Sequence, residues 1–173
     1  MRHWLWLLAF VTAQSLADPS PVSRAFQVQA VVANGCVFGT SVSSPVSDLG
    51  TIDFGTVTNL SSGQSAASTA GNGSIILTCT PGISVSVGLG SGLNGVGATE
   101  RYLKQVGGTE LLAYQLYQDA GQILVWGTGS QALTISSFPS STQTYTVYAR
   151  LLGRSGLPSA GEYVDTVVVE LIY

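Results

Sequence analysis

The sequence predicts an all-β domain, a sandwich or barrel of antiparallel strands. Short runs of Val, Ile, Leu and Tyr recur along the chain, and clusters of Gly, Ser, Pro and Asn separate them, as turns separate strands. The chain has 21 glycines and scattered Ser and Thr, and its apolar residues show no convincing helical period. Together these observations favour many short strands.

The predicted strands follow one another at the spacing of a sandwich. In chain order they are 51–54, 74–79, 83–89, 111–118, 123–126, 132–135, 145–152 and 163–173. Asn94-Gly95 and Gly107-Gly108 are residue pairs typical of hairpin turns. Residues 59–73 are rich in Ser, Ala and Gly without an apolar pattern, so we expect a mobile surface loop there.

Strand-like segments stand at both ends of the domain. The alternate apolar positions before the first cysteine hold Phe26, Val28, Ala30 and Val32. The sequence ends on the strand 163–173, so we expect no later segment to pair with that strand. Because a bare apolar edge is an association site that most soluble monomers cover or charge, the two ends predict a polymerising subunit.

Length and charge limit the class of protein. A chain of 173 residues with 45% hydrophobic and 9% charged residues can bury one ordinary core, so we expect a single domain. The net charge is -3 and the isoelectric point is near 4.8. Nucleic acid is not an expected partner, because phosphate binding needs clustered Lys and Arg.

Residues 1–17 have the pattern of a secretory signal peptide. Arg2 and His3 precede an apolar run at 4–13 that is too short to span a bilayer, and Ser15-Leu16-Ala17 is a small-residue cleavage site. We expect cleavage before Asp18, and no lipid anchor or membrane insertion of the mature chain. The protein is then exported through the periplasm and either secreted or assembled at the cell surface.

Two cysteines, Cys36 and Cys79, predict one disulfide. An even pair in an exported chain is usually oxidised. Closing this loop would stabilise the fold by about 3–4 kcal/mol. Zinc is not expected, because two cysteines without histidine partners cannot supply the usual four ligands.

The sequence predicts no enzyme and no catalytic, cofactor or metal site. His3 is the one histidine and would leave with the signal peptide, which excludes Ser/His and Cys/His nucleophile systems from the mature chain. The carboxylates show no defensible pairing; they are Asp48, Asp53, Glu100, Glu110, Asp119, Glu162, Asp165 and Glu170. Gly90, Gly92 and Gly95 match a dinucleotide-binding pattern, but without a following helix they predict only a flexible turn.

Four aromatic residues leave a sugar-binding function open. Tyr102, Tyr114, Tyr117 and Trp126 could stack on a saccharide if they shared one exposed face. Such residues more often fill a sandwich core, which is the interpretation we favour.

Several blocks of the mature chain, in this order, resemble a known domain. They are the alternation before Asn34-Gly35-Cys36, then 49–55, 101–104, 112–120, 126–127 and 161–166. Each block alone is weak, but the ordered set is similar to the spore coat protein U domain, which is found in subunits of archaic, Csu-type chaperone-usher pili.

The resemblance implies an incomplete immunoglobulin-like β-sandwich that lacks its last strand. Residues 34–173 would form the domain, and the extension 18–33 would carry the donor strand that completes a neighbouring subunit. The donated side chains would be Phe26, Val28, Ala30 and Val32. The edge that receives the chaperone and then the donor would carry Val167, Val169, Leu171 and Tyr173. The alternative is that residues 25–33 form an ordinary first strand of their own domain.

The implied function is that of a structural pilus subunit. Such a subunit polymerises by donor-strand exchange with identical or related pilins, through a periplasmic chaperone and an outer-membrane usher, for surface attachment and biofilm formation. A major rod subunit and a minor adaptor fit equally, whereas a tip adhesin would need a second domain. The alternatives are a secreted, monomeric carbohydrate-binding module and a coat protein of a spore or cyst.

Overall fold

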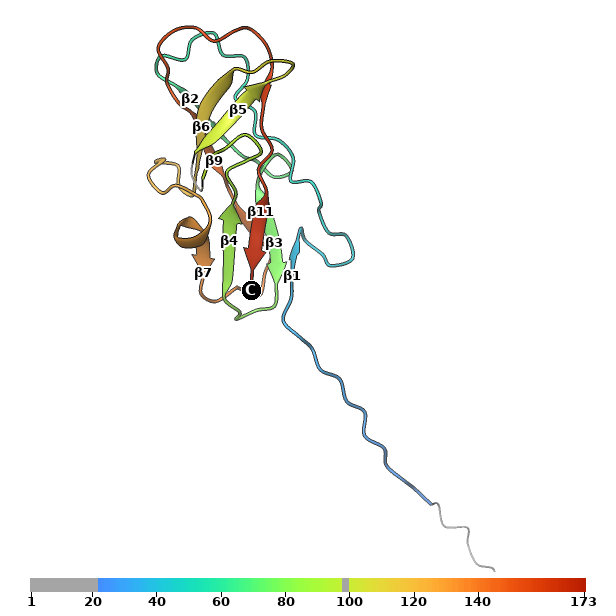
Figure 1. Ribbon diagram of the computed structural model, residues 1–173. Coiled ribbons are helices and arrows are strands. Elements are labelled where there is room, and N and C mark those ends of the chain that lie inside the picture. The colour runs from blue at the N-terminus through green and yellow to red at the C-terminus, as the bar shows by residue number, and fades with distance from the viewer. Residues whose placement is uncertain (1–21, 98–99) are drawn as a thin grey trace, which may run out of the picture. The chain divides into compact units, whose positions relative to one another are not determined.

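The computed structural model describes residues 22–97 and 100–173. Its strands form three antiparallel sheets (Figure 1). The first sheet has the order β1 (Cys36–Phe38), β3 (Ile75–Cys79) and β8 (Gln143–Tyr145). The second has the order β10 (Tyr163–Val164), β5 (Arg101–Gln105), β6 (Leu111–Tyr117), β9 (Tyr148–Leu151) and β2 (Gln64–Ala67). The third has the order β11 (Val169–Ile172), β4 (Val85–Leu89) and β7 (Leu133–Ile135), preceded by a short 3-10 turn, η1 (Gly129–Gln131). The predicted all-β class is confirmed.

One apolar core joins the three sheets. Alternate side chains of β3, β4, β6 and β9 point inward, as the two-residue period of a strand requires. The buried side chains of these strands are Ile75, Leu77, Cys79, Val85, Val87, Leu89, Leu112, Tyr114, Leu116, Ala149 and Leu151, and they belong to one continuous cluster. The inward faces of these four strands therefore form one side of a shared core.

A buried arginine fastens the second sheet to the third. Arg101 of β5 is 1% exposed. Its guanidinium donates to the carbonyl oxygens of Leu89 (2.8 Å), Gly90 (2.9 Å) and Trp126 (2.8 Å), and its Nη1 also contacts Gln115 Oε1. Burial lowers the pKa of Arg101. The side chain thus supplies hydrogen bonds to backbone carbonyls that the end of β4 would otherwise leave unpaired.

Four predicted strands are confirmed with shorter bounds, and two are divided. Segments 74–79, 83–89, 111–118 and 132–135 contain β3, β4, β6 and β7. Segment 145–152 is interrupted at 146–147, where the chain passes from β8 in the first sheet to β9 in the second. Segment 163–173 contains β10 and β11, which belong to different sheets, because residues 165–168 bond to residues 90–94 instead of continuing the first ladder.

Two predicted strands are absent from the described structure. At 51–54 and nearby, the carboxylates of Asp48 and Asp53 accept hydrogen bonds from the backbone N–H groups of Gly50 (2.9 Å) and Gly55 (2.8 Å). At 123–126, the Asp119 carboxylate accepts from two successive backbone N–H groups, and a single isolated bridge joins Tyr117 to Val125. In both places hydrogen bonds from the backbone to a nearby carboxylate replace the backbone hydrogen bonds that would pair the segment with another strand.

The expected mobile loop at 59–73 is wrong in part, because it contains β2. This strand pairs with β9, and Leu60 and Ser68 on either side of it are buried. The Ser68 hydroxyl lies 2.9 Å from the Ser74 hydroxyl and accepts a hydrogen bond from the backbone N–H of Val147 (2.8 Å). Small polar residues therefore fill a buried seam that their composition did not indicate. The strand β5 was likewise not expected.

The predicted disulfide is present. Cys36 and Cys79 are bonded, and they are register partners at one end of the β1–β3 pair. The bond ties the first residue of the domain's first strand to the middle of the sheet and closes a loop with a sequence separation of 43 residues.

Replacing Cys36 by Ser is expected to destabilise the domain by about 3–4 kcal/mol, because the unfolded chain regains the freedom that the closed loop removes. Folded yield after export and the unfolding midpoint, with and without reductant, measure the effect. Equal midpoints for the reduced and oxidised wild-type protein would contradict the expectation.

The residues before the domain form a separate unit. The compact unit that holds the sheets spans 33–173. Residues 22–32 contain no helix or strand, and their apolar side chains are exposed. The expected signal peptide at 1–17 lies outside the described residues. Within the described residues no helix is long and apolar enough to span a bilayer.

Candidate functional site

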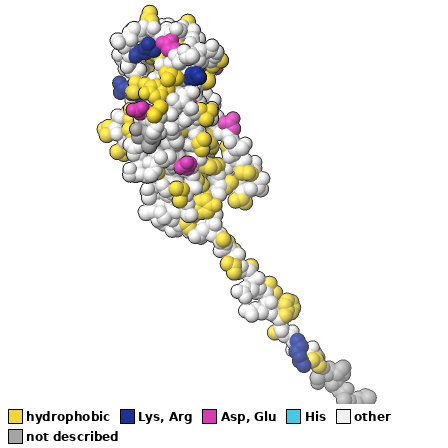
Figure 2. Space-filling view, in the orientation of Figure 1, with side chains coloured by type: hydrophobic (Ala, Val, Ile, Leu, Met, Phe, Trp, Pro, Cys, Tyr) yellow, Lys and Arg dark blue, Asp and Glu magenta, His cyan; other side chains and the backbone are white. Residues whose placement is uncertain are grey.

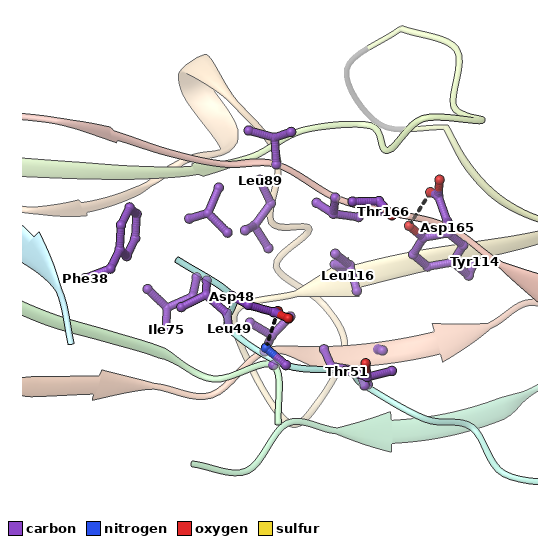
Figure 3. Close-up of a pocket in the computed structure, with 18 of the residues that line it drawn as sticks. Phe38, Asp48, Leu49, Thr51, Ile75, Leu89, Tyr114, Leu116, Asp165 and Thr166 are labelled. Atoms are coloured by element: carbon purple, nitrogen blue, oxygen red, sulfur yellow. Dashed lines mark hydrogen bonds between the residues drawn. The ribbon is translucent and has the colours of Figure 1, made fainter. Parts of the chain in front are cut away.

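An open groove with a volume of about 720 Å³ enters the core of the sandwich (Figure 3). Folded interiors hold few voids larger than a water molecule, which takes ~30 Å³ of liquid volume. The volume of the groove is instead that of a ligand site. A cavity of this size, lined by core side chains, has room for several side chains of another segment.

The floor of the groove is the core itself. Side chains from strands of all three sheets line it; among them are Ile75, Leu89, Leu103, Leu116 and Ala149. Most of these are fully buried, and all are apolar. The floor of the groove therefore offers an incoming group an apolar surface to pack against.

One wall of the groove is the last strand and the residues before it. Residues 165–169 line the cavity, and β11 continues from them. The strand β11 pairs with β4 on one side only, because it stands at the end of the order β11-β4-β7. Its other edge has no strand partner among the described residues, so its outward N–H and C=O groups are available to a further strand.

The opposite wall is an extended segment without a ladder. Residues 46–52 and Phe54 line the cavity from this side. The segment is held by the turn at Asp48 and by the hydrogen bond from the Gly73 N–H to the Leu49 carbonyl oxygen (2.6 Å). Gly50 has φ +85°, and a Cβ there would lie 2.2 Å from the Gly71 carbonyl oxygen, so this approach requires glycine.

One end of the groove is polar. The Tyr114 hydroxyl donates to Asp165 Oδ2 at 2.7 Å (Figure 3). Asp165 Oδ1 accepts from the backbone N–H groups of Leu93 (2.9 Å) and Asn94 (3.2 Å). Burial, with the neighbouring carboxylate, raises the pKa of Tyr114. These bonds close the groove at the start of its last-strand wall, so that an apolar occupant has a defined end point.

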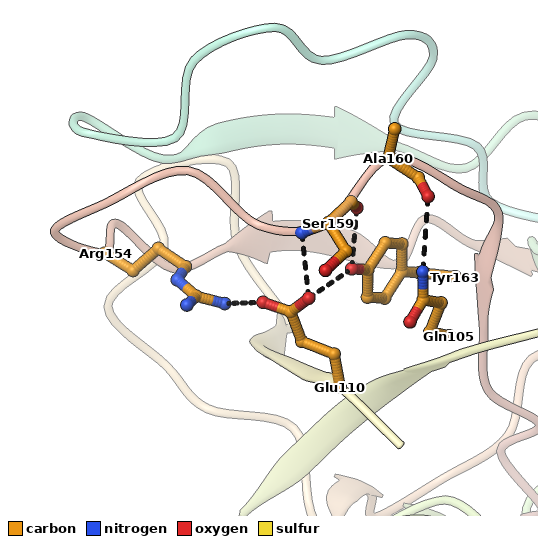
Figure 4. A network of polar contacts seen from close by, with 6 residues as sticks. All are labelled: Gln105, Glu110, Arg154, Ser159, Ala160 and Tyr163. Carbon is orange, nitrogen blue, oxygen red and sulfur yellow. Dashed lines mark hydrogen bonds and ion pairs between the residues drawn. The ribbon is translucent and has the colours of Figure 1, made fainter. Parts of the chain in front are cut away.

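A second polar network holds the loop that leads into this wall (Figure 4). Glu110 Oε2 accepts from the Ser159 backbone N–H (2.8 Å) and lies 3.1 Å from the Tyr163 hydroxyl, and Oε1 pairs with Arg154 Nη1 (2.8 Å). The hydrogen bonds from Ser159, with those from Tyr163 and Arg154, lower the pKa of Glu110 to about 2. The carboxylate therefore stays ionised at any physiological pH and fixes β10 just before the chain enters the groove.

Comparison with protein families identifies the chain. The model of the spore coat protein U domain matches residues 22–170. The chain belongs to the spore coat protein U domain family. No curated protein matches significantly.

One solved structure shares the fold of this spore coat U domain, and a second is less similar. One is described as the CsuC-CsuE chaperone-tip adhesion subunit pre-assembly complex from archaic chaperone-usher Csu pili of Acinetobacter baumannii, with 20% identity over 82% of this chain and a TM-score of 0.56. The other is described as a chaperone-tip adhesin complex vital for synergistic activation of CFA/I fimbriae biogenesis, with 19% identity over 69% of this chain and a TM-score of 0.46. The match spans 40% of the first structure's chain and 38% of the second's.

Of the four residues that were predicted for the acceptor edge of this spore coat U domain, two line the groove. Val167 and Val169 line it, and the half-buried Leu171 packs against the core. Tyr173 is 59% exposed and does not line it. The other wall, 46–54, and the polar end were missed as site elements. Their residues fall partly within the blocks 49–55, 112–120 and 161–166, which indicated the family without assigning a role.

The four apolar side chains of the extension are all exposed, which accords with their availability to a partner. Phe26 is 88%, Val28 83% and Val32 91% exposed, and Ala30 is exposed as well. Their role as donors stays a prediction.

The suggested sugar platform is not formed by the aromatic residues named from the sequence. Tyr114 and Trp126 are buried in the core, as favoured, with Trp126 Nε1 donating to the Val87 carbonyl oxygen (2.9 Å). Tyr102 and Tyr117 are half-buried. On the face shown in Figure 2, positive and negative side chains lie among one another near one end of the domain, and those of one sign form no continuous patch.

Proposed function

We propose that the protein is a pilus subunit that polymerises by donor-strand exchange. The observation that carries this proposal is the groove beside β11, an apolar cavity of about 720 Å³ that opens the core along an unpaired strand edge. A strand added there would pair with β11 through its backbone and insert alternate side chains into the groove. This is β-strand addition between chains.

The occupant that the chain itself offers is the segment 24–33. Its alternate residues Phe26, Val28, Ala30 and Val32 are apolar and exposed, and the groove is apolar along its floor. Burying Phe26, Val28 and Val32 would contribute about 5–9 kcal/mol. That is comparable to the ~5–15 kcal/mol stability of a whole domain. A subunit with an empty groove would therefore be marginal, and an occupied one very stable.

Because the donor strand would supply so large a part of the stability, the subunit would need another chain in its groove before assembly. An open core exposed in the periplasm would aggregate unless another chain covered it. We propose that a periplasmic chaperone fills the groove first and that an outer-membrane usher exchanges it for the next subunit's extension. The product would be a cell-surface fimbria for attachment and biofilm formation, as membership of the family and the fold shared with the Csu chaperone-subunit complex support.

Deleting residues 18–33 tests the assignment of the donor. The deleted subunit is expected to bind its chaperone as the full chain does but to form no fibre, because it keeps the groove and lacks the strand. Val28→Asp should act in the same direction, since it would place an unpaired charge in an apolar groove. Val22→Asp, in the same exposed extension but outside 24–33, is the matched control and should polymerise normally. Polymers of normal length from the deleted chain would contradict the proposal.

A further inference from the structure

We infer that the domain carries a second, separate site, a small pocket for a neutral monosaccharide unit between β8 and β9. The pocket has a volume of about 250 Å³. Its walls are Gln118, Thr144, Tyr145, Thr146 and Tyr148, over a floor formed by Trp126 and Leu133. This inference goes beyond the proposed function and does not depend on it.

The pocket follows from the break between β8 and β9. At 146–147 the chain leaves the first sheet, where Tyr145 pairs with Ile75, and enters the second, where Tyr148 pairs with Tyr117 and Ala67. The two tyrosines therefore come from different sheets and border one hollow. Its floor is rigid, because Trp126 is 1% exposed and its ring nitrogen and backbone N–H both donate to backbone carbonyls.

The pocket holds polar groups that are not used within the protein. Among the described residues, none forms a hydrogen bond with the side-chain hydroxyls of Thr144, Tyr145, Thr146 or Tyr148. The Gln118 amide nitrogen donates to the Gln131 carbonyl oxygen (3.0 Å), which turns the side chain and leaves Oε1 as an acceptor. The residues that line the pocket thus carry one fixed acceptor and four hydroxyls, each able to donate or accept.

This combination matches the chemistry of a neutral sugar. A pyranose has an apolar C–H face that packs on an aromatic ring and a rim of hydroxyls that need both donors and acceptors. No charged side chain is among the residues that line the pocket, so an anionic sugar or a phosphate gains no ion pair there. Pockets for drug-sized ligands measure ~300–1,000 Å³. The smaller volume here suits one sugar ring, at the end of a chain or as a free unit.

The pocket lies away from the strand-binding groove. The strands β7 and β8 stand at the ends of their sheets opposite to β11 and β1. A strand added at β11 would leave this side uncovered, so a sugar could bind whether or not the groove is occupied. Repeated along a polymer, even a weak site would gain strength through multivalency.

Titrating the exported, folded chain with methyl glycosides of glucose, galactose, mannose and N-acetylglucosamine tests the inference. Ligand-observed NMR or calorimetry should detect at least one glycoside binding at millimolar concentration, with glucose 6-phosphate binding more weakly than glucose. Tyr148→Ala should weaken binding by about tenfold, through loss of the aromatic face. Gln118→Met, which keeps the length of the side chain and removes the acceptor along with the hydrogen bond to Gln131, should weaken binding while the chain stays folded.

Tyr102→Ala is the matched control. Tyr102 is half-buried like Tyr148, but it lies on β5 and does not line the pocket. It should bind as wild type does. The inference is overturned if no neutral glycoside binds, if Gln118→Met binds as tightly as wild type, or if Tyr102→Ala loses as much affinity as Tyr148→Ala.

Discussion

A chain that carries its own copy of the donor strand is expected to be a monomer that needs no chaperone and unfolds at a much higher temperature than the unmodified subunit. The design removes 18–33 and places a copy of residues 24–33 after Tyr173 through a short flexible turn. The copy would fold back antiparallel beside β11, because a short tether raises its effective concentration to the millimolar range or above. Burial of the apolar side chains should raise the melting temperature by about 10–30 °C.

Thermal unfolding and light scattering after size exclusion measure the two parts of this expectation. The matched control carries Asp in place of Val28 and Val32 in the added strand, and it should aggregate and show no gain in melting temperature. A complemented chain that aggregates as the control does would mean that another segment is the donor. A complemented chain whose melting temperature does not exceed that of the control would also mean that another segment is the donor.

Replacing Arg101 by Met is expected to destabilise the domain by about 3–5 kcal/mol, because buried carbonyl oxygens lose their donors. Methionine keeps an unbranched apolar stem, so the loss reports mainly on the hydrogen bonds to Leu89, Gly90 and Trp126. Those bonds join the second sheet to the third at the floor of the groove. Denaturant unfolding of the self-complemented monomer gives the free energy directly.

Lys104→Met on the same strand is the control for the arginine substitution. Lys104 is exposed, and replacing it should change the unfolding free energy by no more than about 0.5 kcal/mol. If Arg101→Met were as stable as Lys104→Met, the guanidinium would not hold the sheets together.

Patterns that depend only on neighbours in sequence predicted much of the fold. The apolar runs in 74–79 and 111–118 predicted β3 and β6, and the structure adds which face of each strand is buried. The pairing of Cys36 with Cys79 followed from their number and from the signs of export. The strand β11 lies within the predicted segment 163–173, and its edge away from β4 has no strand partner among the described residues.

Features that depend on distant partners could not be predicted in the same way. The strand β2 is made of Gln, Ser and Ala, and it exists because β9 offers it a ladder and Ser68 finds hydrogen-bond partners in a buried seam. The segment 51–54 was predicted as a strand, yet the side chains of Asp48 and Asp53 accept hydrogen bonds from backbone N–H groups two residues on and form local turns there. The polar end of the groove joins Tyr114 to Asp165 across 51 positions of sequence, and neither residue signals the other.

The most direct test of the central claim is amide hydrogen exchange of the subunit lacking 18–33, with and without a synthetic peptide of residues 22–33. If the groove receives a donor strand, the peptide is expected to slow exchange along Val169–Ile172, at the amides that do not bond to β4, and a peptide with Asp at position 28 is not. Protection confined to another edge of the sandwich, or bound peptide without any protection of β11, would contradict the claim that this groove receives the neighbouring subunit's strand.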